Sequence, residues 1–365
     1  MLKIMFNLLA CCSLSLFCME LTIKNLSLDK KIGQLFMVAA VADETIEQES
    51  KQKKSYRMDK NYITDLIKNH GIGGIIYLGK SDKEKQIART HYFQSISPIP
   101  LLIGQDLEPG RVGAARFPGI FTFASNKILG DTHDTEVTKI VGTLIGEMCK
   151  ELGVHINFAP VVDVDSNPHN PVINDRAFSN KPQIVTAHGI AFTQGLHEYN
   201  ILACAKHFPG LGDTSIDPHH ALPVINHPKQ RLHGIELYPF KKLIEKKVPA
   251  VMVGHVCVPA FEAEKNLPAT FSKAIVTDLL QKELGFSGLI ITDALDMAAI
   301  TKTYKPGETA VKALCAGNDI LLCPVDVPAA IAAIKNAIKD GVLTEQDIDK
   351  HVEKILKIKK IFFDF

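Results

Sequence analysis

Eight short apolar runs recur along the chain, and helical patterns occupy the intervals between them. The runs lie at residues 34–40, 73–78, 100–105, 155–162, 201–207, 250–255, 288–292 and 319–324. Each is nearly continuous in apolar residues, which is typical of a parallel strand buried on both faces. Eight strands that alternate with helices predict an α/β fold, a (β/α)8 TIM-like barrel, with a doubly wound sheet as the alternative.

The helical patterns carry recognisable start signals. Between residues 137 and 152 the apolar side chains step by three and four, as on the buried face of a helix. Ser272 is placed to cap a helix, Pro328 to open another, and Thr344 to cap the last one. No linker rich in Ser, Pro or Gly divides the chain, so we expect one catalytic domain over residues 19–365.

The first 18 residues differ from the rest. They carry one charged residue, Lys3, followed by a 15-residue uncharged and mostly apolar run. This run is short for a membrane span and has the layout of a secretory signal. Cys18 would allow a lipid anchor, although the residues before it fit a lipoprotein box poorly. Residues 1–18 are therefore predicted to be a signal peptide or an N-terminal anchor.

Composition narrows the location and the partners. Apolar residues make up 46% of the chain and charged residues 22%, with a formal net charge of +1. This balance gives no bias towards nucleic acid. We expect an exported protein, periplasmic or envelope-associated, with a membrane tether at the N-terminus if the segment is retained. If the segment is not a functional signal, the location is cytoplasmic.

The five cysteines beyond the N-terminal segment are widely spaced and sit singly inside apolar runs. They are predicted to be small core residues rather than a disulfide framework or a zinc site. We expect no metal and no cofactor.

Charged and polar residues follow the third to seventh apolar runs. In chain order they are Asp106, Glu108, Arg111, Arg116, Asp163, Asp165, Arg176, Lys206, His207, His255, Asp293 and Asp296. Because the carboxyl ends of barrel strands meet at one face, these side chains are predicted to gather there, where barrel enzymes carry their active sites.

Several of these residues have a plain structural interpretation. Asp163 and Asp165 are equally consistent with turn caps, His255 with a satisfied buried histidine, and Asp296 with a charge serving a helix N-terminus. An ion pair with Arg111 is the alternative for Asp106. A purely structural interpretation fits Asp293 less well, because a carboxylate directly after an apolar strand is costly to bury. We therefore expect it to have a functional role.

The stretch from residue 206 to residue 223 holds a second catalytic pattern, Asp217-Pro218-His219. A carboxylate two residues from an imidazole can accept one ring N–H and fix the tautomer. The other ring nitrogen can then give or take a proton near neutral pH. With Asp293, this provides a nucleophile and an acid/base on two different loops.

Two other chemistries use the same stretch. His207, His219 and His220 could bind a metal, although their spacing matches no standard ligand pattern. Lys206, at the end of a strand, could form a Schiff base.

The stretch 206–223 closely resembles the signature of family 3 glycoside hydrolases, in particular their bacterial β-N-acetylglucosaminidase (β-hexosaminidase) branch. Further matches occur in the family's order at residues 106–111, 157–164, 175–179 and 288–297. Together they cover nearly all of the chain from about residue 28.

The resemblance implies a retaining exo-β-N-acetylglucosaminidase that removes terminal N-acetylglucosamine from peptidoglycan-derived muropeptides. It implies a covalent glycosyl-enzyme on the nucleophile Asp293, with His219 as acid/base and Asp217 as its partner. The residues that it assigns to the sugar ring are Asp106, Arg116, Arg176, Lys206 and His207. We expect a monomer that acts on a small carbohydrate. The alternatives are an N-acetylglucosaminide phosphorylase and a non-catalytic envelope sugar-binding protein.

Some positions depart from the family's pattern. Leu211 stands where a histidine is usual and Pro218 where a serine is usual, and Pro218 restricts Asp217. Arg116 lies two residues farther along the chain than the family's spacing places it. Family members that act on glucosides often add a second domain; this chain ends soon after its eighth unit, which favours the hexosaminidase branch.

Overall fold

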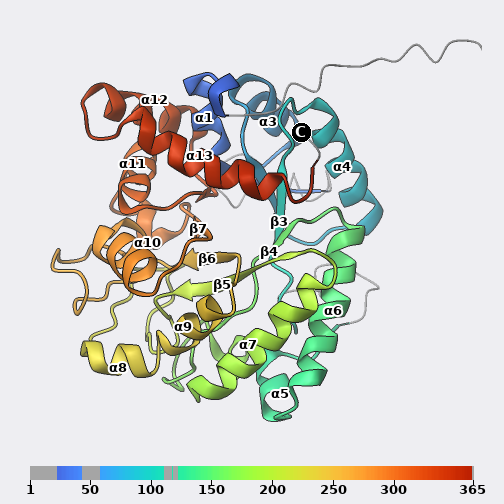
Figure 1. Cartoon of the computed structure of the whole chain (residues 1–365), viewed down its shortest axis with the longest axis vertical. Coiled ribbons are helices and arrows are strands. Elements are labelled where there is room, and N and C mark those ends of the chain that lie inside the picture. Colours follow the sequence, from blue (N-terminus) through green and yellow to red (C-terminus); the bar gives the residue numbers. More distant parts are fainter. Residues whose placement is uncertain (1–22, 43–57, 111–116, 118–121, 364–365) are drawn as a thin grey trace, which may run out of the picture.

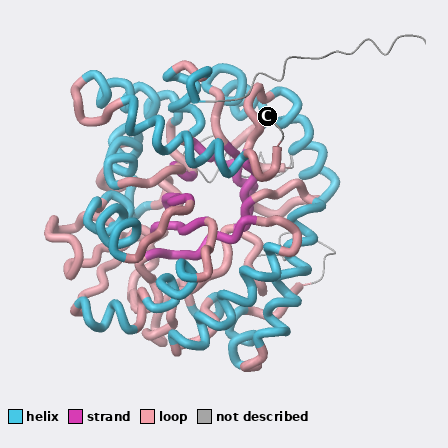
Figure 2. The backbone as a smooth tube through the Cα atoms, in the orientation of Figure 1, coloured by secondary structure: helices cyan, strands magenta, loops and turns pink. Residues whose placement is uncertain are grey.

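The computed structural model describes residues 23–42, 58–110, 117 and 122–363. Within them, eight strands form one sheet in the order β7-β6-β5-β4-β3-β2-β1-β8, and neighbouring strands pair in parallel. A parallel bridge between Ile291 and Ile320 joins the two edges. The strands therefore form a ring with helices outside it (Figures 1 and 2). The predicted (β/α)8 barrel is confirmed, because a doubly wound sheet would stay open.

Each predicted run contains a strand. The strands are β1 (Phe36–Ala40), β2 (Gly74–Tyr77), β3 (Leu102–Gln105), β4 (Ile156–Asn157), β5 (Leu202–Phe208), β6 (Ala250–Val253), β7 (Leu289–Thr292) and β8 (Leu321–Leu322). β4 is much shorter than the predicted run at 155–162, because Pro160 has no N–H to donate to a neighbouring strand. Pairing resumes just beyond it, at a bridge between Val161 and Lys206.

Helices follow the strands and cover the outside of the barrel. They are α1 (Leu28–Gln34), α3 (Lys60–Asp65), α4 (Lys83–Ile96), α5 (Asn126–Asp131), α6 (Thr135–Glu151), α7 (Pro182–His197), α8 (Lys229–Gly234), α9 (Tyr238–Glu245), α10 (Ala298–Thr301), α11 (Pro306–Ala316), α12 (Val327–Lys339) and α13 (Glu345–Lys359). Short 3₁₀ turns lie at Ile23–Asn25, Asn174–Arg176 and Ala269–Phe271, and π-helical segments at Leu66–His70 and Ala274–Glu283. No helix in these ranges combines the length and the apolar character that crossing a membrane requires.

The predicted helix starts are largely confirmed. Thr344 caps α13 in a reciprocal capping box with Asp347. Ser272 accepts a hydrogen bond from the Ile275 N–H, although the helix that follows is π-helical. The prediction for α12 was wrong by one residue. This helix begins at Val327, because the side chain of Asp326 accepts from the Ala329 N–H and serves as the cap.

The end of α13 is tied to the end of α1 by a buried lysine. The Lys359 ammonium donates to Gln34 Oε1 at 2.6 Å, and Gln34 Nε2 donates to the Gly71 carbonyl at 2.7 Å. Lys359 is fully buried, and burial lowers its pKa to about 7 from the usual 10.5. The folded protein therefore binds this proton less tightly than the unfolded chain does.

We expect the contribution of Lys359 to stability to rise with pH between about 7 and 10.5, because the unfolded chain then holds a proton on this lysine that the folded protein lacks. The Lys359 contribution to the unfolding free energy is about 1.4 kcal/mol per pH unit. Lys359→Met should remove this contribution, as measured by urea unfolding between pH 7 and 9. Lys357→Met, on the exposed side of the same helix, is the control. Parallel pH dependences for the wild type and Lys359→Met would contradict the assignment.

Candidate active site

A cavity of about 660 Å³ lies at the carboxyl ends of the strands. Its charged and titratable lining comes from the segment after β3, the 3₁₀ turn at Asn174–Arg176, the end of β5, the loop that follows β5 and the end of β7. These residues are Asp106, Glu108, Arg176, Lys206, His207, His219, Asp293 and Asp296. Side chains far apart in the chain therefore share one space, as the strand-end pattern predicts.

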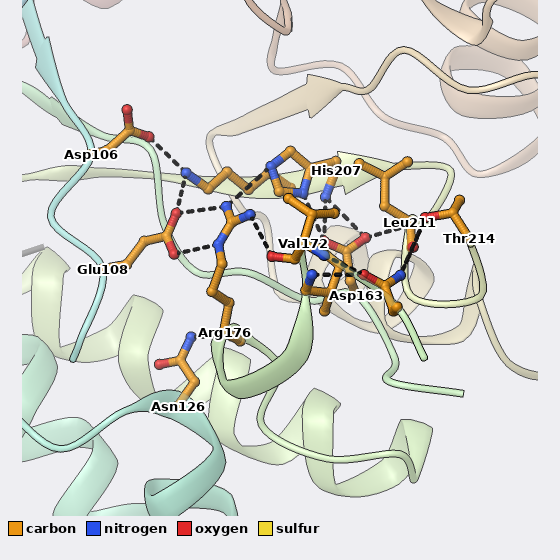
Figure 3. A network of polar contacts seen from close by, with 12 residues as sticks. Asp106, Glu108, Asn126, Asp163, Val172, Arg176, His207, Leu211 and Thr214 are labelled. Carbon is orange, nitrogen blue, oxygen red and sulfur yellow. Dashed lines mark hydrogen bonds and ion pairs between the residues drawn. The ribbon is translucent and has the colours of Figure 1, made fainter. Parts of the chain in front are cut away.

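A buried carboxylate joins two cations at one side of the cavity (Figure 3). Glu108 accepts from Arg176 Nε and Nη2, both at 2.9 Å, and its Oε1 lies 2.7 Å from Lys206 Nζ. Lys206 also donates to Asp106 Oδ1 at 2.7 Å. The Glu108 and Lys206 side chains are only 1% and 3% exposed. This arrangement satisfies charges that would otherwise be costly to bury.

The network sets the protonation state of both buried groups. Burial alone would raise the pKa of Glu108, but Arg176 and Lys206 hold it well below its usual range. Burial alone would lower the pKa of Lys206, but Asp106 and Glu108 outweigh it and raise that pKa. Lys206 is therefore held as an ammonium, and the geometry argues against the Schiff-base alternative, which needs a neutral amine.

Asp163 orients His207 rather than capping a turn alone. Its Oδ2 lies 2.7 Å from His207 Nδ1, and the backbone N–H groups of His207 and Leu211 donate to the same carboxylate. With Nδ1–H directed at Asp163, the other ring nitrogen faces the Arg176 guanidinium, with Nη2 at 3.5 Å from Nε2. Figure 3 shows these groups as one connected set.

Asp293 follows β7 directly and lines the cavity. Its Oδ1 accepts from the Ala294 N–H at 2.8 Å. Burial would raise the pKa of Asp293, but the nearby His207 and His255, together with this N–H, lower it below its usual value. The group is thus an ionised carboxylate at neutral pH, which is the form that a nucleophile requires.

His255 is a satisfied buried histidine. Its ring contacts the Thr270 hydroxyl at 2.7 Å and the Ala294 carbonyl at 3.0 Å. Burial lowers its pKa, so the neutral ring is favoured. It lies behind Asp293 rather than in the cavity lining.

Asp217 and His219 form the predicted pair. Asp217 Oδ1 lies 2.7 Å from His219 Nδ1 and also accepts the His219 backbone N–H at 2.8 Å. Burial would raise the pKa of Asp217, but these contacts with His219 lower it. The His219 side chain is 62% exposed and lines the cavity, whereas Asp217 lies behind it. With Nδ1 held, Nε2 is the nitrogen left for proton transfer.

The structure brings together most of the predicted site. Asp106, Arg176, Lys206, His207, His219 and Asp293 line one cavity, and Asp217 supports His219. Arg116 and Arg111 lie outside the described residues, so the assignment of Arg116 to the sugar stays a prediction. In the described part of the chain, no group of three or more His, Cys, Asp or Glu side chains is arranged to hold a metal ion.

Glu108 and Asp163 were predicted to lie at this face but were given no role in the site. Glu108 lies two positions after Asp106, and Asp163 lies beyond β4. Their positions at strand ends were the available signal. Their partners could not be read from the chain, because the cations that pair with Glu108 come from other elements.

The departures at Leu211 and Pro218 leave the backbone contacts intact. The Leu211 N–H donates to Asp163, and its carbonyl accepts from Asn170. The Pro218 carbonyl accepts from the Ala299 N–H at 3.1 Å. These bonds use main-chain atoms, so they do not depend on the usual histidine or serine side chains.

Residues 27–358 match the family described as glycosyl hydrolase family 3 N terminal domain. The chain belongs to this family. It is 34% identical over 327 residues to β-hexosaminidase A of Pseudoalteromonas piscicida, a match that covers 81% of this chain and 54% of the relative. The chain thus spans about half the length of that protein.

Two solved structures extend the comparison. A family 3 β-N-acetylglucosaminidase from Paenibacillus sp. str. FPU-7 is 36% identical with a TM-score of 0.83, covering 92% of this chain and 62% of that one. The β-glucoside phosphorylase BglX, bound to 2FGlc, is 25% identical, also with a TM-score of 0.83, covering 92% and 59%. The same barrel therefore occurs in proteins named for hydrolysis and for phosphorolysis.

Glu108→Gln should destabilise the protein, because it removes the negative charge shared by Arg176 and Lys206 and leaves buried cations underpaired. We expect a loss of about 3 kcal/mol in the free energy of unfolding, measured by urea denaturation. Glu353→Gln changes an exposed carboxylate on α13 and should cost less than about 0.5 kcal/mol. Equal losses for the two variants would show that the buried network does not hold these elements together.

Proposed function

We propose that this protein is a retaining exo-β-N-acetylglucosaminidase. The observation that carries the proposal is that an ionised Asp293 and the Asp217–His219 pair lie at one cavity of about 660 Å³. Ligand pockets typically measure about 300–1,000 Å³, so the space suits a sugar with part of its aglycone. Membership of glycoside hydrolase family 3 supports the reaction class.

The proposed reaction has two steps. In the first, an Asp293 oxygen attacks the anomeric carbon, the bond to the leaving oxygen breaks, and the His219 imidazolium gives that oxygen its proton. In the second, neutral His219 takes a proton from water, whose oxygen attacks the anomeric carbon and releases Asp293. Two displacements give overall retention of configuration. The imidazole replaces the carboxylic acid of the usual two-carboxylate scheme.

The charged network is proposed to hold the sugar ring. Lys206 and Arg176 offer N–H donors, and Asp106 offers carboxylate oxygens to the ring hydroxyls. His207, oriented by Asp163, adds a ring nitrogen on the same side. Because Glu108 and Asp163 restrain these groups before a ligand arrives, binding would cost little side-chain ordering.

The proposed natural substrates are muropeptides derived from peptidoglycan, with N-acetylglucosamine at the non-reducing end. The likeness to proteins named β-hexosaminidase supports the N-acetylglucosamine residue, and the aglycone is the less constrained part. Release of N-acetylglucosamine from muropeptides should exceed release from chitobiose at equal concentration. The reverse order would reject the muropeptide assignment and keep the glycosidase.

Phosphorolysis is the second candidate. An imidazole acid/base, unlike a carboxylate, does not repel an incoming phosphate, and the chain resembles a solved β-glucoside phosphorylase. Turnover that depends on phosphate and yields sugar 1-phosphate would favour it over hydrolysis. Sugar binding without turnover under any condition would favour the non-catalytic alternative.

Export to the periplasm or envelope is a further part of the proposal. It is supported by the apolar run within residues 1–18, which lie outside the described residues. Mass spectrometry of the mature N-terminus tests it. A cleaved or lipidated N-terminus fits export, and an intact Met1 in the cytoplasmic fraction contradicts it.

Asp293→Ala should reduce hydrolysis of an aryl N-acetyl-β-glucosaminide by about 10,000-fold or more, because no nucleophile remains for the first step. Asp340→Ala, an exposed aspartate at the end of α12, should leave the rate unchanged. Initial rates, with circular dichroism to verify folding, measure both. The mechanism fails if the Asp293 variant keeps wild-type activity or if the wild type has none.

A further inference from the structure

The loop that carries Asp217 and His219 is docked on the segment that follows Asp293. The Pro218 carbonyl accepts from the Ala299 N–H at 3.1 Å, and the His220 carbonyl accepts from Lys302 Nζ at 2.7 Å. These two carbonyls flank His219 on either side in the chain. The two halves of the proposed catalytic machinery are therefore joined by a pair of hydrogen bonds next to the acid/base residue.

The contact with Ala299 also completes a helix. The N-cap residue of α10 is Met297, and no side chain caps this helix. The Ala299 N–H is one of the donors that a helix leaves unpaired in its first turn, and the Pro218 carbonyl satisfies it. The loop thus takes the place of a capping side chain.

The two stems of the loop are anchored by other contacts. On the incoming side, Asp213 accepts from the Ser166 hydroxyl at 3.1 Å and pairs with His227. On the outgoing side, the Pro223 carbonyl accepts from the Cys257 N–H at 2.9 Å. These contacts hold the ends of the loop and leave its central part to other interactions.

The central part, residues 216–222, is here called the loop tip. In the described part of the chain, the hydrogen bonds that join the tip to the rest of the protein are those with Ala299 and Lys302. Ile216, at 45%, and the His219 side chain, at 62%, are exposed, whereas Pro218 is buried and Asp217, Ala221 and Leu222 are half-buried. The tip is therefore held over the cavity by the packing around Pro218 together with two hydrogen bonds, one of which comes from a side chain.

We propose that Lys302 is a positioning residue for His219. Its ammonium holds the loop tip on α10, so that His219 faces the cavity beside Asp293. Lys302 is exposed and is not part of the cavity lining, so it acts through the loop and not on the substrate. The expected effect of Lys302 on catalysis rests on the proposed glycosidase function, whereas the docking of the loop does not depend on that function.

Leaving groups of different basicity separate this role from a general structural one. A dinitrophenyl leaving group needs no proton from His219 in the first step, whereas a phenyl leaving group does. Lys302→Met keeps the stem and removes the donor, so kcat/KM for the phenyl N-acetyl-β-glucosaminide should fall about fivefold, the effect of one net hydrogen bond. For the dinitrophenyl substrate, kcat/KM should change by less than about twofold.

Three variants make the comparison specific. Lys302→Arg retains a cationic donor and should restore most of the phenyl rate. Lys305→Met alters another exposed lysine three residues away and should leave kcat/KM unchanged for both substrates. His219→Ala removes the acid/base itself. It should also lower kcat/KM more for the phenyl than for the dinitrophenyl substrate, and the difference should be larger than in Lys302→Met. If Lys302→Met lowers kcat/KM equally for the phenyl and dinitrophenyl substrates, or for neither of them, Lys302 does not position the acid/base.

Hydrogen exchange measures the docking of the loop tip without relying on glycosidase activity. Amides of residues 216–222 should exchange faster in Lys302→Met than in the wild type or Lys305→Met, because the tip loses one of its two hydrogen bonds to the rest of the protein. Unchanged exchange would overturn the inference. Faster exchange in a protein without any glycosidase activity would support the docking role and reject the proposed function, so the two failures are distinguishable.

Discussion

The shared ion pair at Glu108 is the interaction on which the site depends. This carboxylate, buried after β3, binds Arg176 from a 3₁₀ turn and Lys206 from β5. Glu108 would be costly to bury without a cation, and Arg176 and Lys206 would be costly to bury without a carboxylate. The network thereby brings three separate segments to one face of the barrel and fixes the spacing of the groups that surround the cavity.

A chain of contacts leads from this network to the other charged groups around the cavity. Arg176 faces His207, which Asp163 holds from the other side. His207 and the Ala294 N–H in turn favour the ionised form of Asp293. One side of the cavity is therefore preorganised, with protonation states set by neighbours and not by solvent. The other side is formed by the exposed His219, whose loop tip has two hydrogen bonds to the rest of the protein.

The barrel itself does not decide the reaction. The same fold matches solved proteins named as an N-acetylglucosaminidase and as a phosphorylase at equal TM-scores, which is expected where function lies in loops carried by a common scaffold. What distinguishes such proteins is expected in the side chains around the sugar and the acceptor. In this chain the proposed acid/base His219 belongs to that set, on the loop tip that contacts Lys302 and Ala299.

The sequence by itself determined the barrel and half of its site. The apolar strand runs, capping residues such as Thr344 and the positions of Lys206 and Asp293 at strand ends are local patterns, so they can be read along the chain. Only the tertiary structure decided the roles of Glu108, Asp163 and Lys302. Their partners lie 68, 44 and 82 residues away. The physical reason is that a buried or docking group is defined by what faces it, and no local period encodes a contact between distant segments.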